Sequence, residues 1–478
     1  MANVLTAKKE ENMPEWYQQV CLKAELADFA PVKGCFILRP NGYSIWQSIQ
    51  TYFDQHINKA TGVKNAYFPL FIPERFFTKE KEHAEKLSIE VAWLDKDVTG
   101  EGDRLAVRPT SETIMYDSYS QWIRSYRDLP LKINQWCNVV RWETEATKLF
   151  LRSREFLWQE GHCVYETEQE CAQETLNYIK LYGMLCKDLL ALPVIIGRKT
   201  DKEKFAGADY TYTIEGFMPD GKALQAGTSH MLGQRFARAF NIKFLGKDEK
   251  EHLPWQNSWG LSTRLIGAMV MTHADNKGMV LPPRVAEHKL VVVPVFIGDA
   301  KEKVSKKAKE IVSQLKAFNP LFDDREEYNH GWKCTEWELK GIPLRIELGP
   351  KDLEKEQVVI VRRDTGTKEF VPLKDLNQKI QSTLDAMHHD MYKKAESFLQ
   401  QSLATADNIK DLKKLADKGK LVKVPFCGGI DCEEEVKTAT EGITSRCSPL
   451  DDAIVKKGSK CFNCGKEAHI NVLFARSY

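Results

Sequence analysis

Four cysteines near the C-terminus form two close pairs. Cys427 and Cys432 are separated by Gly-Gly-Ile-Asp, and Cys461 and Cys464 follow as Cys-Phe-Asn-Cys. Each pair can bind a metal ion through two thiolates, and two such pairs give the tetrahedral four-thiolate arrangement that Zn²⁺ prefers. The spacing therefore predicts a Zn²⁺ site with a structural role, because four protein ligands leave no open position for a substrate. Four unrelated thiols are the alternative, and Cys447 lies between the pairs as a competing candidate ligand.

Arginines in the N-terminal half are the second set of side chains that could do chemistry. That half contains neither glycine-rich phosphate loop, GxxxxGK[ST] or GxGxxG, so a nucleotide would have to be bound by other groups. A guanidinium suits this task because its planar fork matches phosphate oxygens and it keeps its charge. Arg141 stands two residues before Glu143, on the same face of an expected strand, and Arg264 opens an apolar, helix-like run. For Arg141, a structural ion pair with Glu143 is the alternative.

The segments around these arginines indicate an α+β fold with an antiparallel sheet. Aromatic, strand-like runs occupy residues 65–73, 133–143 and 156–166, and apolar residues at three- and four-residue spacing predict a helix over 167–192. Strand runs separated by single long helices, without regular βαβ alternation, favour an antiparallel sheet over a doubly wound one. We expect this first domain to span residues 1–285.

Two smaller domains are expected after a Pro-Pro break in the pattern. Strand-like runs at 289–298 and 358–363 flank a lysine-rich, helix-like segment at 301–318. This order suggests a small α/β domain with a mostly parallel sheet over residues 286–403. The cysteine-bearing tail forms the third expected domain, residues 404–478.

The composition indicates a globular protein without a membrane segment. The 478 residues are 42% hydrophobic and 28% charged, which is the usual balance of globular proteins. No apolar run reaches the roughly 18 residues of a membrane span, and the N-terminus lacks the apolar run of a signal peptide, so a cytoplasmic location is expected. Twelve cysteines in such a chain favour reduced thiols or a metal site over disulfides. With a net charge of +2, contacts to nucleic acid would have to come from local patches.

The order of these segments resembles the class II aminoacyl-tRNA synthetases, in which three motifs build an antiparallel sheet around ATP. Pro69 in YFPLF resembles the proline of motif 1, RWE with RSREFLWQEGH resembles motif 2, and GLSTRLIG resembles motif 3. The HIGH and KMSKS signatures of the class I enzymes are absent. Four segments are similar to the prolyl-tRNA synthetases in particular: RPTSET, FLRSREFLWQEGH, LQAGTSHMLGQ and QNSWGLSTR. The tail resembles the zinc-binding C-terminal domain of the archaeal and eukaryotic-type branch, so the resemblance covers nearly the whole chain.

This resemblance implies a ligase that activates L-proline with ATP and Mg²⁺ and loads it onto tRNA(Pro). Arg141 and Arg264 match the two catalytic arginines. The residues that match the proline pocket are Thr110, Glu112, Arg141, Trp158, His162 and His230. Those that match the ATP site are Arg141, Glu143, Arg152, Ser153, Phe156, Gln225, Thr228, Ser262 and Arg264, with Gln225 also matching a Mg²⁺ contact. The family often has threonine where this chain has Ser262, and a histidine taken alone is more often a structural group than a ligand contact.

The resemblance also implies partners and leaves two rival interpretations. The second domain resembles an anticodon-binding domain, notably over residues 341–366, and motif 1 implies a homodimer. The interval 160–260 is too short for the editing domain that bacterial-type prolyl enzymes often insert, so no editing in cis is expected. One rival is a synthetase for threonine or another amino acid. The other is a non-catalytic, tRNA-binding protein derived from a synthetase.

Overall fold

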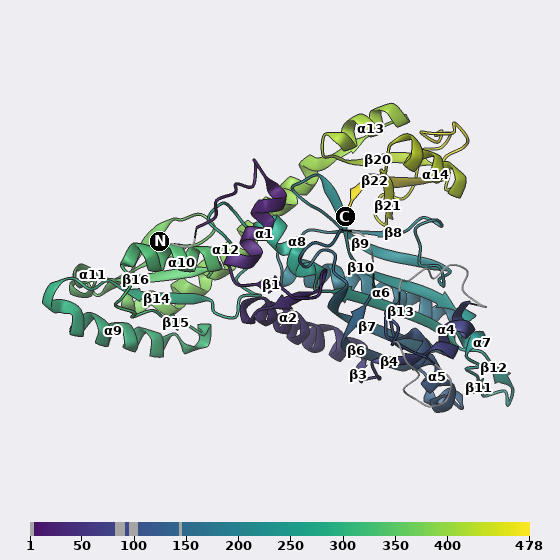
Figure 1. The fold of residues 1–478 in the computed structure, drawn as a ribbon, viewed down its shortest axis with the longest axis horizontal. Coiled ribbons are helices and arrows are strands. Elements are labelled where there is room, and N and C mark those ends of the chain that lie inside the picture. Colours follow the sequence, from purple (N-terminus) through teal and green to yellow (C-terminus); the bar gives the residue numbers. More distant parts are fainter. Residues whose placement is uncertain (1–3, 82–90, 95–103, 143–145) are drawn as a thin grey trace.

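The large sheet at the centre of the molecule confirms the expected antiparallel α+β architecture (Figure 1). The computed structural model describes residues 4–81, 91–94, 104–142 and 146–478. The sheet has eleven strands, which in spatial order are β19 (Leu403–Thr405), β20 (Leu421–Phe426), β22 (Ile470–Ser477), β21 (Thr444–Pro449), β8 (Ile195–Arg198), β9 (Tyr210–Phe217), β10 (Lys222–Gly233), β13 (Trp255–Ser262), β7 (Glu155–Tyr165), β6 (Leu131–Val140) and β3 (Lys64–Asn65). Its central pairs are antiparallel.

Three helices cover one face of this sheet and bury its core. They are α2 (Pro40–Phe53), α6 (Glu168–Asp188) and α8 (Arg264–His273). The helix predicted over 167–192 is confirmed as α6, whose first turn is capped by the Thr167 side chain accepting a hydrogen bond from the Glu170 amide. The Trp259 ring stacks on Tyr178 from α6 with 4.1 Å between ring centroids. Gly161 opposes Trp259, and a Cβ there would lie 2.1 Å from the indole, so only glycine fits at this point of β7.

The remaining elements of the first part of the chain surround this sheet. They are α1 (Met13–Lys23), β1 (Ala27–Phe29), β2 (Phe36–Leu38), α3 (Lys59–Thr61), β4 (Phe71–Pro73), α4 (Glu74–Lys81), β5 (Leu105–Val107), α5 (Glu112–Trp122), α7 (Arg235–Ala239), β11 (Phe244–Leu245) and β12 (Glu251–His252). Residues 160–260 are all described and belong to β7 through β13 with α6 and α7, so they hold no separate inserted domain. No helix in the described part of the chain is long and apolar enough to cross a membrane.

The second domain has a mixed sheet rather than the mostly parallel one expected. Its strands, in spatial order, are β15 (Leu321–Phe322), β14 (Leu290–Pro294), β16 (Leu344–Leu348), β17 (Gln357–Arg362) and β18 (Lys368–Pro372). β14 pairs in parallel with β15 and β16, but β17 is antiparallel to β16 and β18. The reason is the short connection from β16 to β17, residues 349–356, which is too short for the crossover that parallel strands need. A second short turn, through Gly366 with φ 71°, then reverses the chain between β17 and β18. The helices are α9 (Lys301–Gln314), α10 (His330–Lys340), α11 (Pro350–Glu354) and α12 (Leu376–Ser402).

The C-terminal part of the chain is built into the large sheet. It contains α13 (Ile409–Asp417) and α14 (Ile430–Ala439), and its strand β21 pairs antiparallel with β8 while β22 pairs in parallel with β10. A buried ion triad lies beside this junction: Lys199 contacts Glu215 at 2.8 Å, and Arg446 contacts the same carboxylate at 2.9 Å. The third domain expected from the sequence is therefore continuous with the first through backbone hydrogen bonds and buried charges.

Candidate active site

One cavity on the open face of the large sheet brings together most of the residues predicted to act on substrates. Its volume is about 360 Å³. The predicted residues that line it are Thr110, Glu112, Arg141, Phe156, Trp158, His162, Gln225, Thr228, His230, Ser262 and Arg264. Glu160, Glu203, Phe205 and Ser258 also line it and were not predicted.

Strand register explains how distant segments meet in this cavity. Alternate residues of a strand share a face, so Trp158, Glu160 and His162 of β7 point the same way. Ser258 of β13 pairs with His162 on one side and with His230 of β10 on the other.

A β-bulge in β10 changes which of its side chains face the cavity. The register shifts between Gln225 and Gly227, and the extra residue lets Gln225 line the same cavity as Thr228 and His230. Without this bulge, the odd spacing from Gln225 to Thr228 would put the two side chains on opposite faces of the sheet.

A buried carboxylate, Glu112, lines this cavity. Glu112 is the first residue of α5 and is 6% exposed, and it accepts a hydrogen bond from the Thr110 hydroxyl. A carboxylate at a helix N-terminus is favoured by the helix dipole. Its burial makes it an effective partner for a substrate cation, because charges attract more strongly away from water.

A second buried carboxylate, Glu160, is the main site residue that the sequence prediction missed. Ser111 donates to it through its hydroxyl and through its amide at 3.1 Å, Gln135 Nε2 donates at 3.1 Å, and His162 Nε2 lies 3.2 Å away. Burial raises the pKa of Glu160, yet hydrogen bonds from His162 and Ser111 hold it below its ordinary value. The signal was present in the strand alternation, because Glu160 lies between Trp158 and His162 on one face of β7.

The two predicted histidines have opposite protonation tendencies. Burial lowers the pKa of His162, but its hydrogen bond with Glu160 and the charge of Glu112 raise it above the ordinary value. The Tyr116 hydroxyl contacts the other ring nitrogen of His162 at 3.0 Å. Burial lowers the pKa of His230 to about 3, and the charge of His162 adds to this effect. His230 is therefore neutral at physiological pH and sits between the Thr211 and Thr228 hydroxyls at 2.9 and 3.0 Å.

The two predicted arginines enter the cavity from different elements. Arg141 lies just beyond β6, which ends at Val140, so the expectation that it stands within a strand is wrong. Its Nε donates to the Pro109 carbonyl at 3.2 Å, and its guanidinium lies 5.3 Å from the Trp158 ring. Arg264 begins α8 as expected, donating to the Leu151 carbonyl and to the Gln225 carbonyl, both at 3.1 Å.

Three predicted ATP contacts are not among the residues lining this cavity. Arg152 and Ser153 come at the end of a turn in which the backbone of Lys148 pairs with that of Arg152. The side chains of Arg152 and Ser153 are half-buried, and neither lines the cavity. Glu143 lies outside the described residues.

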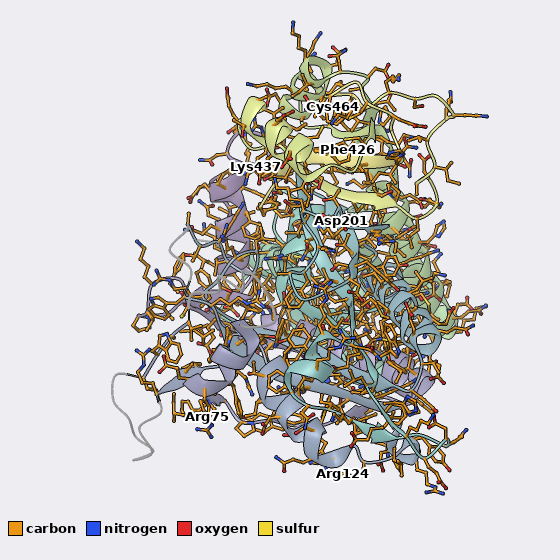
Figure 2. The ribbon with its side chains drawn as sticks, turned by 90° about the vertical axis from the view of Figure 1, so that its right-hand side faces the viewer. Arg75, Arg124, Asp201, Phe426, Lys437 and Cys464 are labelled. Carbon is orange, nitrogen blue, oxygen red and sulfur yellow. The ribbon has the colours of Figure 1, made fainter. Side chains whose placement is uncertain are left out.

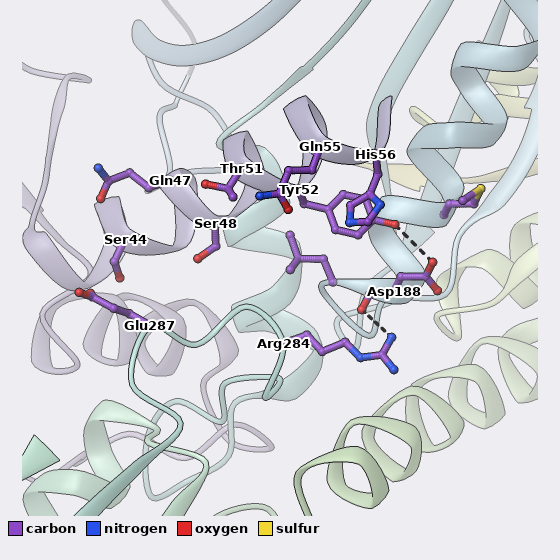
Figure 3. Close-up of a pocket in the computed structure, with 12 residues that line it drawn as sticks. Ser44, Gln47, Ser48, Thr51, Tyr52, Gln55, His56, Asp188, Arg284 and Glu287 are labelled. Atoms are coloured by element: carbon purple, nitrogen blue, oxygen red, sulfur yellow. Dashed lines mark hydrogen bonds between the residues drawn. The ribbon is translucent and has the colours of Figure 1, made fainter. Parts of the chain in front are cut away.

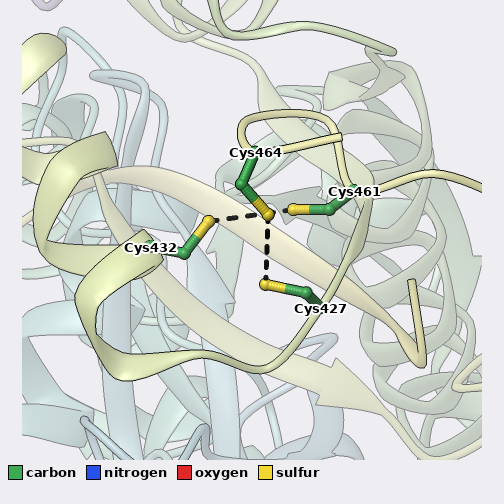
Figure 4. Close-up of side chains that lie close together, drawn as sticks. All are labelled: Cys427, Cys432, Cys461 and Cys464. Atoms are coloured by element: carbon green, nitrogen blue, oxygen red, sulfur yellow. Dashed lines mark hydrogen bonds between the residues drawn. The ribbon is translucent and has the colours of Figure 1, made fainter. Parts of the chain in front are cut away.

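The four predicted cysteines form one cluster at the surface of the C-terminal domain (Figure 4). Their sulfurs lie within 4.8 Å of one another, with 3.7 Å between Cys464 and Cys427 and 3.8 Å between Cys432 and Cys461. A disulfide would need about 2.05 Å, whereas a tetrahedral ion with Zn–S bonds of about 2.3 Å separates its sulfurs by about 3.8 Å. The cluster therefore fits a bound tetrahedral metal ion.

A larger cavity elsewhere gathers none of the predicted residues. It has a volume of about 650 Å³ and lies between α2, the end of α6 and Arg284 (Figure 3). Its lining is mainly hydroxyl and amide side chains, with Tyr52 donating to the Asp188 carboxylate at 3.3 Å. Its carboxylates, Asp188 and Glu287, and its guanidinium, Arg284, belong to none of the predicted motifs, so we do not assign the chemistry to it.

Comparisons with known proteins identify similar sequences along the whole chain. Residues 93–273 match the family described as tRNA synthetase class II core domain (G, H, P, S and T), residues 289–383 match the anticodon binding domain, and residues 409–478 match the C-terminal domain of prolyl-tRNA synthetase. The chain is 48% identical to proline–tRNA ligase 2 of Bacillus cereus (strain ATCC 14579), with 98% of each chain covered. It is 46% identical to proline–tRNA ligase 2 of Clostridioides difficile (strain 630) and to proline–tRNA ligase of Natranaerobius thermophilus, with 98% of this chain and 97% of each relative covered.

Proposed function

The chain belongs to the proline–tRNA ligase family, and we propose that the cavity on the large sheet is where it joins proline to ATP before transfer to tRNA(Pro). It is an aminoacyl-tRNA synthetase, a ligase that consumes ATP. The observation that carries the site assignment is the presence of a buried carboxylate, Glu112, and two guanidiniums, Arg141 and Arg264, in one cavity.

The proline end of the cavity suits a small amino acid, whose ammonium group carries a positive charge. Glu112 pairs the secondary ammonium with help from the Thr110 hydroxyl. Trp158 and the neutral ring of His230 offer apolar walls for the pyrrolidine ring, and Glu160 with His162 forms the floor. Glu160 is already paired with His162, and Glu203 is only half-buried, so the buried Glu112 is the carboxylate that receives the substrate charge.

Activation needs orientation and charge stabilisation rather than a general base. The proline carboxylate is ionised, and one of its oxygens bonds to the α-phosphorus while the bond to the bridging oxygen breaks and pyrophosphate leaves with that electron pair. Arg141 bridges the carboxylate and the α-phosphate, and Arg264 stabilises the phosphate charge from α8. A 3′-terminal ribose hydroxyl of the tRNA then attacks the prolyl carbonyl and releases AMP.

Other residues fit the nucleotide. Phe156 offers a face for the adenine ring, Thr228 and Ser262 offer hydroxyls, and the side-chain oxygen of Gln225 is a ligand type that suits Mg²⁺. Bound Mg²⁺ would neutralise charge on the leaving pyrophosphate. Arg152, Ser153 and Glu143 remain predicted contacts to ATP.

Proline-dependent exchange of pyrophosphate into ATP tests this assignment. Arg141→Ala should reduce exchange at least a hundredfold, since removing a positioned charge from a transition state costs about 3 kcal/mol. Arg124→Ala is the matched control and should stay near wild type, because Arg124 is exposed at the lower edge of the molecule in Figure 2 and does not line the cavity. Near-wild-type exchange in Arg141→Ala would refute the site. Exchange driven by threonine would favour the first rival interpretation, and absence of exchange in the wild type would favour the non-catalytic one.

The remaining assignments follow the same family. We propose domain boundaries at 1–285, 286–403 and 404–478, with the middle domain binding the anticodon of tRNA(Pro), and a structural Zn²⁺ on Cys427, Cys432, Cys461 and Cys464. The Gly429 amide and Asn463 Nδ2, 3.5 and 3.4 Å from the sulfurs of Cys427 and Cys432, would support bound thiolates.

A homodimer and a cytoplasmic location are also proposals. Tyr67 and Phe71, on either side of Pro69, are 70% and 45% exposed, which suits burial against a second copy. Sedimentation of the purified chain tests the dimer. With no editing domain between residues 160 and 260, we expect mischarged alanyl-tRNA to persist unless another protein hydrolyses it.

A further inference from the structure

A short segment, residues 200–205, forms part of the wall at the proline end of the cavity; we call it the wall segment. Glu203 and Phe205 line the cavity. The Phe205 ring lies 4.9 Å from the His230 ring, and its amide donates to the Thr211 hydroxyl at 3.1 Å. That hydroxyl in turn contacts His230 at 2.9 Å. The position of the wall segment therefore affects the surroundings of His230 directly.

The wall segment is held by the C-terminal domain through side chains. The buried Thr200 hydroxyl contacts the Ser445 hydroxyl at 3.2 Å, and Ser445 donates to Glu433 at 2.5 Å. Lys202 pairs with Glu434 at 3.1 Å. Figure 2 shows Asp201 of the segment directly below the C-terminal domain, beneath Phe426.

Both glutamates that hold the segment lie on α14. Glu433 is 2% exposed, and its helix α14 packs against β21, which carries Ser445. The hydrogen-bonded chain from α14 to the cavity thus runs from Glu433 through Ser445 and Thr200 to the wall segment.

We propose that Glu433 of the C-terminal domain is a positioning residue for proline recognition, acting through Ser445 and Thr200 on the wall segment. This rests on the proposed function, because it takes the cavity end near His230 as the proline site. The contact adds a role to the C-terminal domain beyond its own folding: it completes the amino-acid pocket from outside the catalytic domain.

The contacts to α14 should strengthen proline binding because they hold the wall segment in one conformation. Within the wall segment, the amide of Glu203 donates to the Thr200 carbonyl at 3.2 Å, as in a single turn. Fixing such a turn costs backbone entropy, which the contacts to α14 offset before substrate arrives. If those contacts are lost, the wall segment must become ordered when proline binds, and the free-energy cost of this ordering weakens proline binding. The nucleotide groups Ser262 and Arg264 lie on β13 and α8, so ATP binding should change little.

The experiment compares the KM values for proline and ATP in the exchange assay. Thr200→Val removes the hydroxyl with little change of shape, and Glu433→Ala removes the carboxylate. Each should raise the KM for proline roughly tenfold, as expected when a buried partner is left unpaired, with the KM for ATP within twofold of wild type. Thr200→Ser and Glu433→Gln, which can still hydrogen-bond, should restore most of the affinity. Lys413→Ala breaks an exposed pair with Glu441 in the same domain and is the control.

Two results would overturn the inference. One is an unchanged KM for proline in Thr200→Val. The other is a parallel rise of both KM values with a lower Tm, which would mean general damage. Thr200→Val lies outside the C-terminal domain, so it remains informative if Glu433→Ala fails to fold. If Thr200→Val behaves as wild type while Arg141→Ala loses exchange, the proposed function stands and this inference alone fails.

Discussion

The buried triad of Lys199, Glu215 and Arg446 gives a sharp prediction about how the C-terminal domain is attached. Glu215 is 1% exposed and accepts from Lys199 Nζ at 2.8 Å and from Arg446 Nη2 at 2.9 Å. Changing Glu215 to glutamine keeps the shape of the side chain but removes its charge. Two buried cations from different parts of the chain would then face each other without a carboxylate.

The cost of this change can be estimated from the burial of the three groups. Removing one member of a buried, hydrogen-bonded ion pair typically costs about 3–5 kcal/mol, because an uncompensated charge is left behind. At about 1.4 kcal/mol per factor of ten, this is a loss of roughly a hundredfold to a few thousandfold in local stability. The exposed acid Asp417, which pairs with Arg476 at 2.6 Å, provides the contrast, since surface pairs contribute at most about 1 kcal/mol.

Amide hydrogen exchange measures this local stability strand by strand. In Glu215→Gln, peptides covering β8 and β21 should exchange roughly a hundredfold faster or more, because these strands pair beside the triad. Asp417→Asn, the same acid-to-amide change, should leave them near wild type. Exchange in β8 and β21 that is equal in the two variants would refute the reasoning.

The same triad also predicts how the stability of the folded chain changes at acid pH. Burial raises the pKa of Glu215, but Lys199 and Arg446 hold it below its ordinary value. The unfolded chain therefore takes up a proton at Glu215 before the folded chain does. The stabilisation that ionised Glu215 contributes is present above its pKa in the unfolded chain, about 4.3. It is lost as the pH falls through the pKa of Glu215 in the folded chain. Glu215→Gln should lack this acid-dependent loss.

Two further predictions concern the metal cluster and a buried histidine. The purified chain should contain one Zn²⁺ per chain by elemental analysis, and Cys427→Ser should lose it while Cys35→Ser, outside the cluster, retains it; equal zinc content in both variants would contradict the site. Burial lowers the pKa of His273 to about 4, so only the unfolded chain takes up this proton between about pH 6.5 and 4 and stability falls over that window. His273→Gln should show a smaller drop in urea midpoint from pH 7 to pH 5 than wild type, whereas the exposed His389→Gln should not differ from it.

Much of the cavity could be predicted because its residues lie in short segments that resemble the motifs of the prolyl-tRNA synthetases. Trp158 and His162 share a face through the period of β7, and Arg264 was expected to open the helix that is α8. Glu160 was missed although the same alternation places it between them. The reason is that a buried carboxylate is costly unless it is paired, and its partners, Ser111 and Gln135, lie on other segments.

Sequence reasoning failed where long-range pairing decides the structure. Nothing local in the tail indicates that Arg446 meets Glu215, which is more than two hundred residues earlier, or that β21 pairs with β8. The mixed sheet of the second domain was missed for a related reason. Strand direction there depends on the short connections before and after β17, residues 349–356 and the turn at Gly366, rather than on the strand and helix pattern used to predict a parallel sheet.

The charges of the cavity follow from how its buried groups satisfy one another before substrate binds. Glu160 accepts from Ser111, Gln135 and His162, so its negative charge is compensated within the protein. His230 stays neutral because burial and the nearby charge of His162 disfavour a second cation. This leaves Glu112, with the Thr110 hydroxyl, as the buried carboxylate that can accept an incoming ammonium group, and it lies in the same cavity as two guanidiniums suited to anions. A cavity arranged in this way favours a molecule with a cationic nitrogen at one end and negative oxygens at the other, which describes an amino acid beside a triphosphate.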